Sequence, residues 1–274
     1  MGPNQLLLWI YFMLLSSSAI GQSSFFISPN AMGKGGVGVT DNDSWSSIIN
    51  PAGTAQLKSA NIAVAYHLPY FVDELSYKSI SGILPFKFGV IAASVNQYGF
   101  SLYQENTFNL AYARGITSNL DVAFQFNYLR THISQSGSGG NLYAGLGLRY
   151  AALENLVLAC YISNPEKANI QINDEVEKIT SLFVLGFKWL SSDNFNVSAE
   201  VEKQTDLELI YKLGLEYSIK NRVWLRTGIL GKPSVYTMGL GFNVHHFNLD
   251  TGIAIHPSLG VSSCFGISYQ FNKK

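Results

Sequence analysis

The chain has 274 residues, with 18 Lys and Arg against 18 Asp and Glu, and only 13% of its residues are charged. Hydrophobic residues make up 47% and aromatic residues 13%. This composition excludes a disordered tail, because disorder needs high net charge and few aromatic residues. It also excludes a nucleic-acid partner, since the balanced charge leaves no excess of Lys and Arg to neutralise phosphates. A soluble all-β protein or a membrane barrel remains.

The N-terminus has the features of a cleaved signal peptide. An apolar run at residues 6–15 is followed by small residues at 16–19, and Ala19-Ile20-Gly21 has the small-x-small form of a cleavage site. The apolar run is about ten residues long, whereas a membrane-spanning helix needs roughly 20. We therefore expect residues 1–21 to be removed on export, which makes Gln22 the first mature residue.

From residue 61 onward, apolar and polar side chains alternate with a period of two, which indicates strands with two unlike faces. In residues 207–219, Leu, Tyr and Ile at odd positions oppose Glu208, Lys212, Gly214 and Glu216. The pattern predicts fourteen strands, and ambiguity in three of them leaves 12 or 16 open. The predicted strands are 60–69, 73–84, 87–98, 105–114, 119–131, 141–150, 155–163, 178–189, 194–202, 207–219, 222–230, 235–244, 246–255 and 262–272.

Strand length and the placement of aromatic residues favour a membrane barrel over a soluble sandwich. The predicted strands have about ten residues, whereas strands of soluble sheets have about five or six. Aromatic residues recur at the strand ends, as in the girdles of outer-membrane barrels: Tyr66, Tyr70, Tyr112, Tyr128, Tyr150, Trp189 and Tyr217. The predicted fold is an all-β, antiparallel transmembrane barrel in the outer membrane of a Gram-negative bacterium, surrounded by outer-membrane lipids.

Most connections on the side away from the chain termini are predicted to be short. The longest is expected near Asn164–Val176, followed by a Gly- and Ser-rich loop at Ser134–Gly140. If both termini lie in the periplasm, these loops face outward. The barrel should then carry little extracellular superstructure.

Strand parity places ten charged side chains on the inner face of the barrel. Six are acidic and four are basic, which is too even for a strongly ion-selective pore. They could mark a substrate path, but a paired network is favoured because charges in a low dielectric need partners. The ten residues are Asp121, Arg149, Lys188, Glu200, Glu202, Glu208, Lys212, Glu216, Arg226 and Asp250.

Residues 22–59 are rich in turn-forming residues and lack the alternation of the strands. A fourteen-stranded barrel is too wide for wall side chains alone to fill, so we expect this segment inside it as a plug, ahead of the barrel at 60–274. Gly33, Gly35 and Gly38 match G-x-G-x-x-G, but no strand precedes them and no helix follows, which argues against nucleotide binding. We expect these glycines to allow tight turns.

Two stretches of this segment resemble the N-terminal hatch of the FadL family: Asn-Ala-Met-Gly-Lys-Gly-Gly-Val-Gly-Val at 30–39 and Ile-Asn-Pro-Ala-Gly at 49–53. That family consists of fourteen-stranded outer-membrane transporters of long-chain fatty acids and other hydrophobic compounds. The resemblance looks closer to their PorV/PorQ-type relatives of Bacteroidetes, which are associated with type IX secretion. It implies hatch residues and identifies no ligand-binding residue. The hatch residues are Gly33, Gly35, Gly36, Gly38, Asn50, Pro51, Ala52 and Gly53.

The resemblance and the short loops predict an accessory barrel of protein secretion (type IX) or envelope assembly that binds secretion or envelope partners. The alternative is a FadL-like passive transporter of fatty acids or other hydrophobic small molecules, and a structural barrel is a third reading. We expect no catalysis, no cofactor and no metal. The sequence has no Gly-x-Ser-x-Gly, and its five histidines show no helical zinc spacing.

Three mechanical expectations follow from the assigned faces. Leu213→Arg should impair assembly by roughly 2–4 kcal/mol if that side chain meets lipid at mid-depth. Gly214→Ser, on the opposite face, should be mild. Deletion of the hatch should raise ion conductance.

Overall fold

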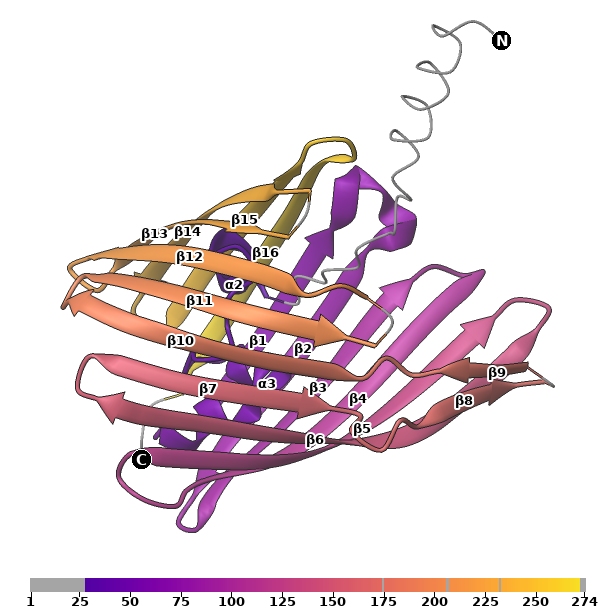
Figure 1. Cartoon of the computed structure of the whole chain (residues 1–274), viewed down its shortest axis with the longest axis horizontal. Coiled ribbons are helices and arrows are strands. Elements are labelled where there is room, and N and C mark those ends of the chain that lie inside the picture. Colours follow the sequence, from indigo (N-terminus) through magenta and orange to yellow (C-terminus); the bar gives the residue numbers. More distant parts are fainter. Residues whose placement is uncertain (1–27, 174, 206, 232, 272–274) are drawn as a thin grey trace, which may run out of the picture.

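Fourteen antiparallel strands close into a barrel (Figure 1). The computed structural model describes residues 28–173, 175–205, 207–231 and 233–271. Neighbours along the chain pair with each other, β1 closes on β16, and β7 pairs with β10 because the hairpin β8–β9 stands outside the barrel. The barrel strands are β1 (Asn61–Leu68), β2 (Tyr77–Phe86), β3 (Gly89–Gly99), β4 (Tyr103–Gly115), β5 (Leu120–Ile133), β6 (Gly137–Leu153), β7 (Leu156–Ser163), β10 (Leu182–Ser192), β11 (Phe195–Gln204), β12 (Ile210–Ile219), β13 (Val223–Leu230), β14 (Val235–Val244), β15 (Phe247–His256) and β16 (Gly260–Gln270).

The burial pattern is that of a membrane barrel, with apolar side chains outside and polar side chains inside. In β5, Phe126 is 55% exposed on the outer face, whereas its neighbour Gln125 is 1% exposed and Asn127 is also buried. Leu213 of β12 is likewise exposed on the outer face. A water-soluble sheet would bury the phenylalanine and expose the glutamine. The predicted fold class is therefore confirmed, with fourteen as the strand number.

Several strand boundaries differ from those predicted. Residues Asp73–Leu75 form the 3-10 helix η3 after η2 (Pro69–Phe71), so β2 begins only at Tyr77. The loop expected at Ser134–Gly140 is shorter, because β6 already begins at Gly137. The tenth predicted strand begins at Ile210 instead of 207. In each case pairing with the adjacent strand sets the boundary, and alternation within one strand does not report that pairing.

The longest outer connection contains structure that the alternation did not reveal. It forms the hairpin of β8 (Asn169–Ile172) and β9 (Glu175–Lys178). Ile170 and Ile172 are buried in a small apolar cluster that also includes Leu129 of β5. This hairpin extends the barrel wall beyond β6, as Figure 1 shows.

Residues 28–57, here called the lumen segment, lie within the ring of strands and contain α2 (Pro29–Gly33), α3 (Ser46–Ile49) and η1 (Pro51–Gln56) (Figure 1). Ser28 caps α2 by accepting from the Ala31 N–H, and Pro29 occupies the first turn, where its missing N–H costs nothing. Among the described residues, no helix is long and apolar enough to cross a bilayer. The predicted signal peptide and residues 22–27 lie outside the described residues, and the domain boundary at 59/60 stays a prediction.

Candidate functional site

The lumen segment contacts the inner wall around the barrel. Helix α2 packs on β13–β16, α3 on β2 and β3, and η1 on β3–β6. Val39 belongs to a buried cluster with Ala159 of β7 and Val184 of β10, and Trp45 shares another with Ala63 of β1. Hydrogen bonds extend these contacts to β11 and β12. The segment thus spans the interior from wall to wall.

A shared carboxylate ties the segment to β10. Asp41 accepts from the Lys34 Nζ at 2.6 Å through one oxygen and pairs with Lys188 of β10 through the other. The Lys34 side chain is only 2% exposed. Burial alone would raise the pKa of Asp41, but the ammonium groups of Lys188 and Lys34 hold it well below its usual range. Asp41 is therefore ionised, as two buried ammonium groups require.

Glu200 of β11 holds the backbone of the lumen segment directly. One of its carboxylate oxygens accepts from the N–H groups of Gly38 and Val39, each at 2.6 Å. Lys212 of β12 lies 3.7 Å from the other oxygen and donates to the Gly36 carbonyl at 3.3 Å. Charge-assisted hydrogen bonds of this kind are stronger than neutral ones. Gly36 and Gly38 thus lie where Lys212 and Glu200 bind the backbone of the lumen segment.

The remaining charges of β11–β15 pair along the wall. Lys212 lies 2.5 Å from Glu202. Arg226 of β13 lies 2.6 Å from Glu216 through Nε and 2.6 Å from Asp250 through Nη1. One guanidinium therefore joins β12, β13 and β15, and its planar fork suits two carboxylates at once.

A third set of contacts holds the end of the lumen segment. Arg149 of β6 lies 3.3 Å from Asp121 of β5 and donates to the Thr40 carbonyl at 3.0 Å. Gln56 donates to the other oxygen of Asp121 at 2.5 Å. The ion pairs of Lys34 and Asp41 and those along the wall are here called the ionic network. Nine of the ten charges placed inside by parity belong to it: Asp121, Arg149, Lys188, Glu200, Glu202, Lys212, Glu216, Arg226 and Asp250. Glu208 does not: it precedes β12 and is exposed, because the strand begins only at Ile210.

Inward-facing glycines make room for the segment. A Cβ on Gly214 would lie 2.5 Å from the Lys34 carbonyl oxygen, and one on Gly228 would lie 2.3 Å from the Gly35 nitrogen. Glycine in a strand interior often marks such a close backbone approach. The expectation that Gly214→Ser is mild is therefore wrong, since the inner face meets protein there. The glycines that approach the segment in this way are Gly147, Gly186, Gly214, Gly228, Gly239, Gly252 and Gly266.

The glycines of the lumen segment have different roles. Gly35 (φ 69°) and Gly36 (φ 79°) adopt the left-handed conformation at the turn that follows α2. Gly33 lies against Gly239 of β14, and a Cβ on it would come within 2.8 Å of the Gly239 Cα. A Cβ on Gly53 would lie 2.0 Å from a backbone carbonyl of the segment. A Cβ on Gly38 would lie 2.8 Å from Cδ1 of Ile49. Of the five glycines in the segment, only Gly35 and Gly36 therefore need the left-handed conformation.

Asn50 links the two halves of the lumen segment to the wall. Its Nδ2 donates to the Val39 carbonyl at 2.8 Å and to the Leu148 carbonyl of β6 at 3.2 Å, and its Oδ1 accepts from the Ala52 N–H at 3.2 Å. Pro51 occupies the first position of η1, for which Asn50 is the cap. Ala52 is buried in a cluster of small apolar residues from β2–β5. Asn50 and Ala52 themselves are fully buried.

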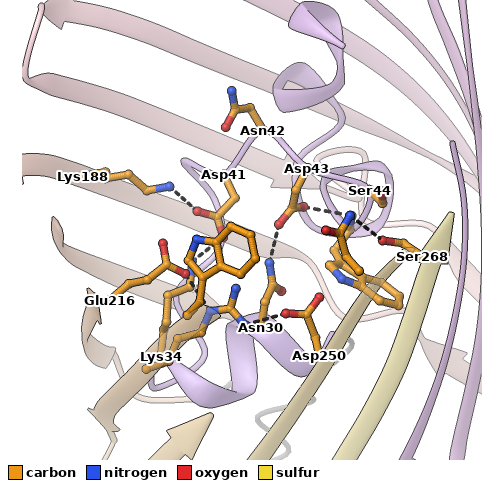
Figure 2. Close-up of a pocket in the computed structure, with 14 residues that line it drawn as sticks. Asn30, Lys34, Asp41, Asn42, Asp43, Ser44, Lys188, Glu216, Asp250 and Ser268 are labelled. Carbon is orange, nitrogen blue, oxygen red and sulfur yellow. Dashed lines mark hydrogen bonds and ion pairs between the residues drawn. The ribbon is translucent and has the colours of Figure 1, made fainter. Parts of the chain in front are cut away.

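A polar cavity of about 290 Å³ lies between the lumen segment, through Asn30, Lys34 and residues 41–45, and the inner faces of β10, β12, β13, β15 and β16 (Figure 2). It borders much of the ionic network and also Asp43, which accepts from the Asn30 amide and from the Trp45 N–H at 2.9 Å. Burial, with the nearby charge of Asp41, raises the pKa of Asp43 to about 6. Within the described part of the chain, no Lys or Arg forms an ion pair with Asp43. The cavity suits water and ions and is unsuited to a hydrocarbon.

The inner face on the other side of the lumen segment is aromatic. His67 of β1 stacks on Tyr77 of β2 at 5.7 Å between ring centroids, and Tyr77 stacks on Tyr98 of β3 at 4.4 Å. Tyr103 of β4 meets Tyr98 edge-on at 6.3 Å. The lumen therefore has a charged half and an aromatic half.

Groups that could support catalysis or metal binding are scattered. The described residues contain no cluster of three or more His, Cys, Asp or Glu suited to a metal ion. Cys160 and Cys264 are free thiols. His132 lies 2.8 Å from the hydroxyl of Ser138, a pair on exposed residues of β5 and β6. The absence of an enzymatic activity and of a cofactor stays a prediction.

Comparison with solved structures gives several barrels of the same fold. The CymD monoaromatic hydrocarbon channel aligns with a TM-score of 0.70 at 11% identity, over 90% of this chain and 98% of that chain. The Pseudomonas putida toluene transporter TodX aligns with a TM-score of 0.66 at 11% identity, over 89% and 98%. A Pseudomonas aeruginosa FadL homologue aligns with 0.63 at 10% identity, over 90% and 98%. The sequence matches no protein-family model and no curated protein.

These structural neighbours correct the predicted function. They are FadL-family outer-membrane channels, which agrees with the coarser resemblance, whereas the closer PorV/PorQ relationship is not confirmed. The interpretation as an accessory of type IX secretion is wrong, because the neighbours are channels or transporters of hydrophobic small molecules. Short loops had favoured partner binding, but loop length does not determine what a lumen admits. The barrel fold matches proteins of the Gram-negative outer membrane, and an origin in Bacteroidetes stays a prediction.

Proposed function

We propose that this protein is a passive channel for hydrophobic small molecules in the outer membrane, with the lumen segment as its hatch. The observation that carries the proposal is the fold likeness to the CymD hydrocarbon channel over 90% of the chain. The second support is the position of the lumen segment inside the barrel. The side chains of a fourteen-stranded wall do not fill so wide a lumen by themselves.

The hatch role rests on how the lumen segment is held. Glu200 and Lys212 grip its backbone, Asp41 joins it to β10, and η1 packs on β3–β6. With contacts to every side of the wall, the segment closes the water-filled route that a barrel of this width would otherwise provide. A solute then crosses in one of two ways. Either the segment shifts and opens the lumen, or the solute leaves the lumen through the wall into the surrounding lipid.

The aromatic half and the charged half of the lumen have different roles. The aromatic half, with Tyr77, Tyr98 and Tyr103, offers apolar carbon to an incoming solute. The charged half holds the hatch in place. Separating a buried ion pair leaves a buried charge without a partner, which costs free energy. Only a small net charge lines the way for ions, because the network pairs six carboxylates with five basic groups.

Uptake by intact cells tests the proposal. The full chain is produced in a Gram-negative host that lacks its own FadL-family channels, and the initial uptake of radiolabelled toluene and oleate is compared with that of vector-only cells. We expect faster uptake of at least one hydrophobic probe and unchanged uptake of a sugar of similar size. Equal uptake in the two strains, with the barrel detected as folded in the outer membrane, would overturn the proposed function.

A further inference from the structure

The polar cavity beside the lumen segment is bordered by more acids than bases. Its acids are Asp41, Asp43, Glu216 and Asp250, and its bases are Lys34, Lys188 and Arg226. Asp43 accepts only from neutral donors, which include the Asn30 amide and the Trp45 N–H, whereas the other three acids are held in ion pairs. The pKa of Asp43 is about 6, so this group is mostly ionised at neutral pH. The cavity therefore carries an excess of one negative charge.

Asp250 of β15 brings a carboxylate oxygen without a donor to this cavity. Its Oδ1 accepts from Arg226 at 2.6 Å, but its Oδ2 accepts from no described residue, although the side chain is only 9% exposed. An unpaired oxygen on a nearly buried charged group is costly unless water or a ligand donates to it. The negative charge of Asp250 also helps to raise the pKa of Asp43, so the two carboxylates are near each other. Figure 2 shows them on either side of Asn30.

The cavity can be reached from solvent. Asn42 at its edge is exposed, and Asp43 is only half-buried. On the wall, the cavity is bordered by Trp224, Asn248 and Ser268, which lie close to the strand ends on the side of the barrel where β16 ends. A solute can therefore enter at this end of the barrel without moving the lumen segment.

The size and lining of the cavity suit an organic cation better than a metal ion. Its volume of about 290 Å³ exceeds the ~30 Å³ that one water molecule occupies in the liquid. The described residues contain no group of three or more His, Cys, Asp or Glu suited to a metal ion. Two indole rings, of Trp45 in the lumen segment and Trp224 in β13, border the same space. Indole rings attract cations and offer apolar surface to an alkyl group.

We propose that this cavity binds a small organic ammonium ion, of the class of short aliphatic amines. The ammonium group donates to Asp43 and to Oδ2 of Asp250, and the alkyl part packs on Trp224. The ligand neutralises the excess charge and joins the lumen segment to β13 and β15. Its binding therefore holds the lumen segment against the wall. This inference goes beyond the proposed channel function and does not depend on which solutes cross the barrel.

Equilibrium binding to the purified full chain in detergent at neutral pH tests the assignment. The probes are propylamine, its neutral isostere propan-1-ol, and potassium ion. We expect propylamine to bind more tightly than either of the others. Bound propylamine should also slow hydrogen exchange in residues 28–57. Equal binding of propylamine and propan-1-ol would overturn the inference, and so would tighter binding of potassium, because the occupant would then be a metal ion.

Variants locate the site within the cavity. Asp43→Asn keeps the shape of the side chain and an acceptor for the Trp45 N–H, and it should weaken propylamine binding about tenfold, since a hydrogen bond between charged groups is lost. Asp73→Asn makes the same change on the exposed η3 and should leave the binding constant unchanged. Equal binding by wild-type protein and folded Asp43→Asn would refute the site.

A second variant tests the wall side of the cavity independently of Asp43. Trp224→Leu removes the half-buried indole of β13 and should weaken propylamine binding severalfold, because the cation loses the ring. Unchanged binding by this variant would contradict the assigned position of the alkyl part. Uptake of hydrophobic probes is a separate measurement, so a failure of the channel proposal would leave these binding constants unaffected.

Discussion

Gly214 of β12 lies against the backbone of Lys34, and a Cβ added to Gly214 would lie 2.5 Å from the Lys34 carbonyl oxygen. The wall and the lumen segment therefore meet with no space for a methyl group. This contact explains why glycine stands at an inner position of a strand, where it otherwise weakens the sheet.

Gly214→Ala should destabilise the protein because the added methyl group overpacks this contact. We expect a loss of about 1–3 kcal/mol in the free energy of unfolding, measured by urea titration in detergent micelles. Gly82→Ala in β2 is the matched control, since a Cβ there meets nothing within 4 Å. Equal stability of the two variants would contradict the close contact at Gly214.

Asp41→Asn should release the lumen segment. The change leaves the ammonium groups of Lys34 and Lys188 buried without their shared carboxylate, and breaking a buried pair costs about 3–5 kcal/mol. The barrel strands keep their own hydrogen bonds, so the loss should be local. We expect faster hydrogen exchange in residues 28–57 and higher ion conductance in planar bilayers.

Asp73→Asn is the control for this experiment, because Asp73 is exposed in η3, away from the ionic network. Its conductance should equal that of the wild type. If Asp41→Asn also leaves conductance and exchange unchanged, the Asp41 ion pairs do not hold the segment in place.

Asp43 should make the stability of the lumen segment depend on pH. Burial raises its pKa to about 6, above the value in the unfolded chain, so the folded protein keeps a proton that the unfolded chain releases. Stability contributed by the protonated group is therefore complete below the unfolded pKa of about 4 and is lost as the pH rises through 6. Thermal unfolding of wild type and Asp43→Asn at several values from pH 4 to 7 measures this. The difference between the two proteins should change with pH only in that interval, and a constant difference would refute the assignment.

Leu213→Arg should impair the barrel, because Leu213 is 43% exposed on the outer face between Ala199 and Ile229 of the neighbouring strands. An arginine there costs about 2–4 kcal/mol if it lies near the middle of the bilayer. Leu259→Arg, in the loop between β15 and β16, changes the same residue type at a position outside the strands. Folding into lipid vesicles, followed by electrophoretic mobility, should be reduced for Leu213→Arg only.

The fold was predictable because successive side chains of a transmembrane strand point alternately to the lipid and to the lumen, so apolar and polar residues alternate. The alternation of Phe124 and Phe126 with Gln125 and Asn127 gives both the strand and its two environments without knowledge of any partner. The hairpin β8–β9 was not predictable in this way, since each of its strands has only four residues and its buried face rests on Leu129, which is distant in sequence.

The candidate site was predictable only in part. Parity placed Lys188, Glu200 and Arg226 on the inner face, but it gave no reason to select Lys34 or Asp41, which lie in a segment without periodicity. Glycine at Gly214 looked like the lining of an open lumen, because a missing side chain does not show what fills its space. Among the described residues, the buried Oδ1 of Asn96 has no hydrogen-bond donor, and this too depends on residues of the neighbouring strands.

The sequence by itself determined the class of barrel, the two faces of its strands and the inward direction of most of its charges, since these follow from local alternation. The pairing of the strands decided that their number is fourteen. Only the tertiary structure decided how the interior is divided. The lumen segment acquires its conformation from β6, β10, β11 and β12 together, and such contacts between distant parts of the chain leave no periodic trace in the residues that make them.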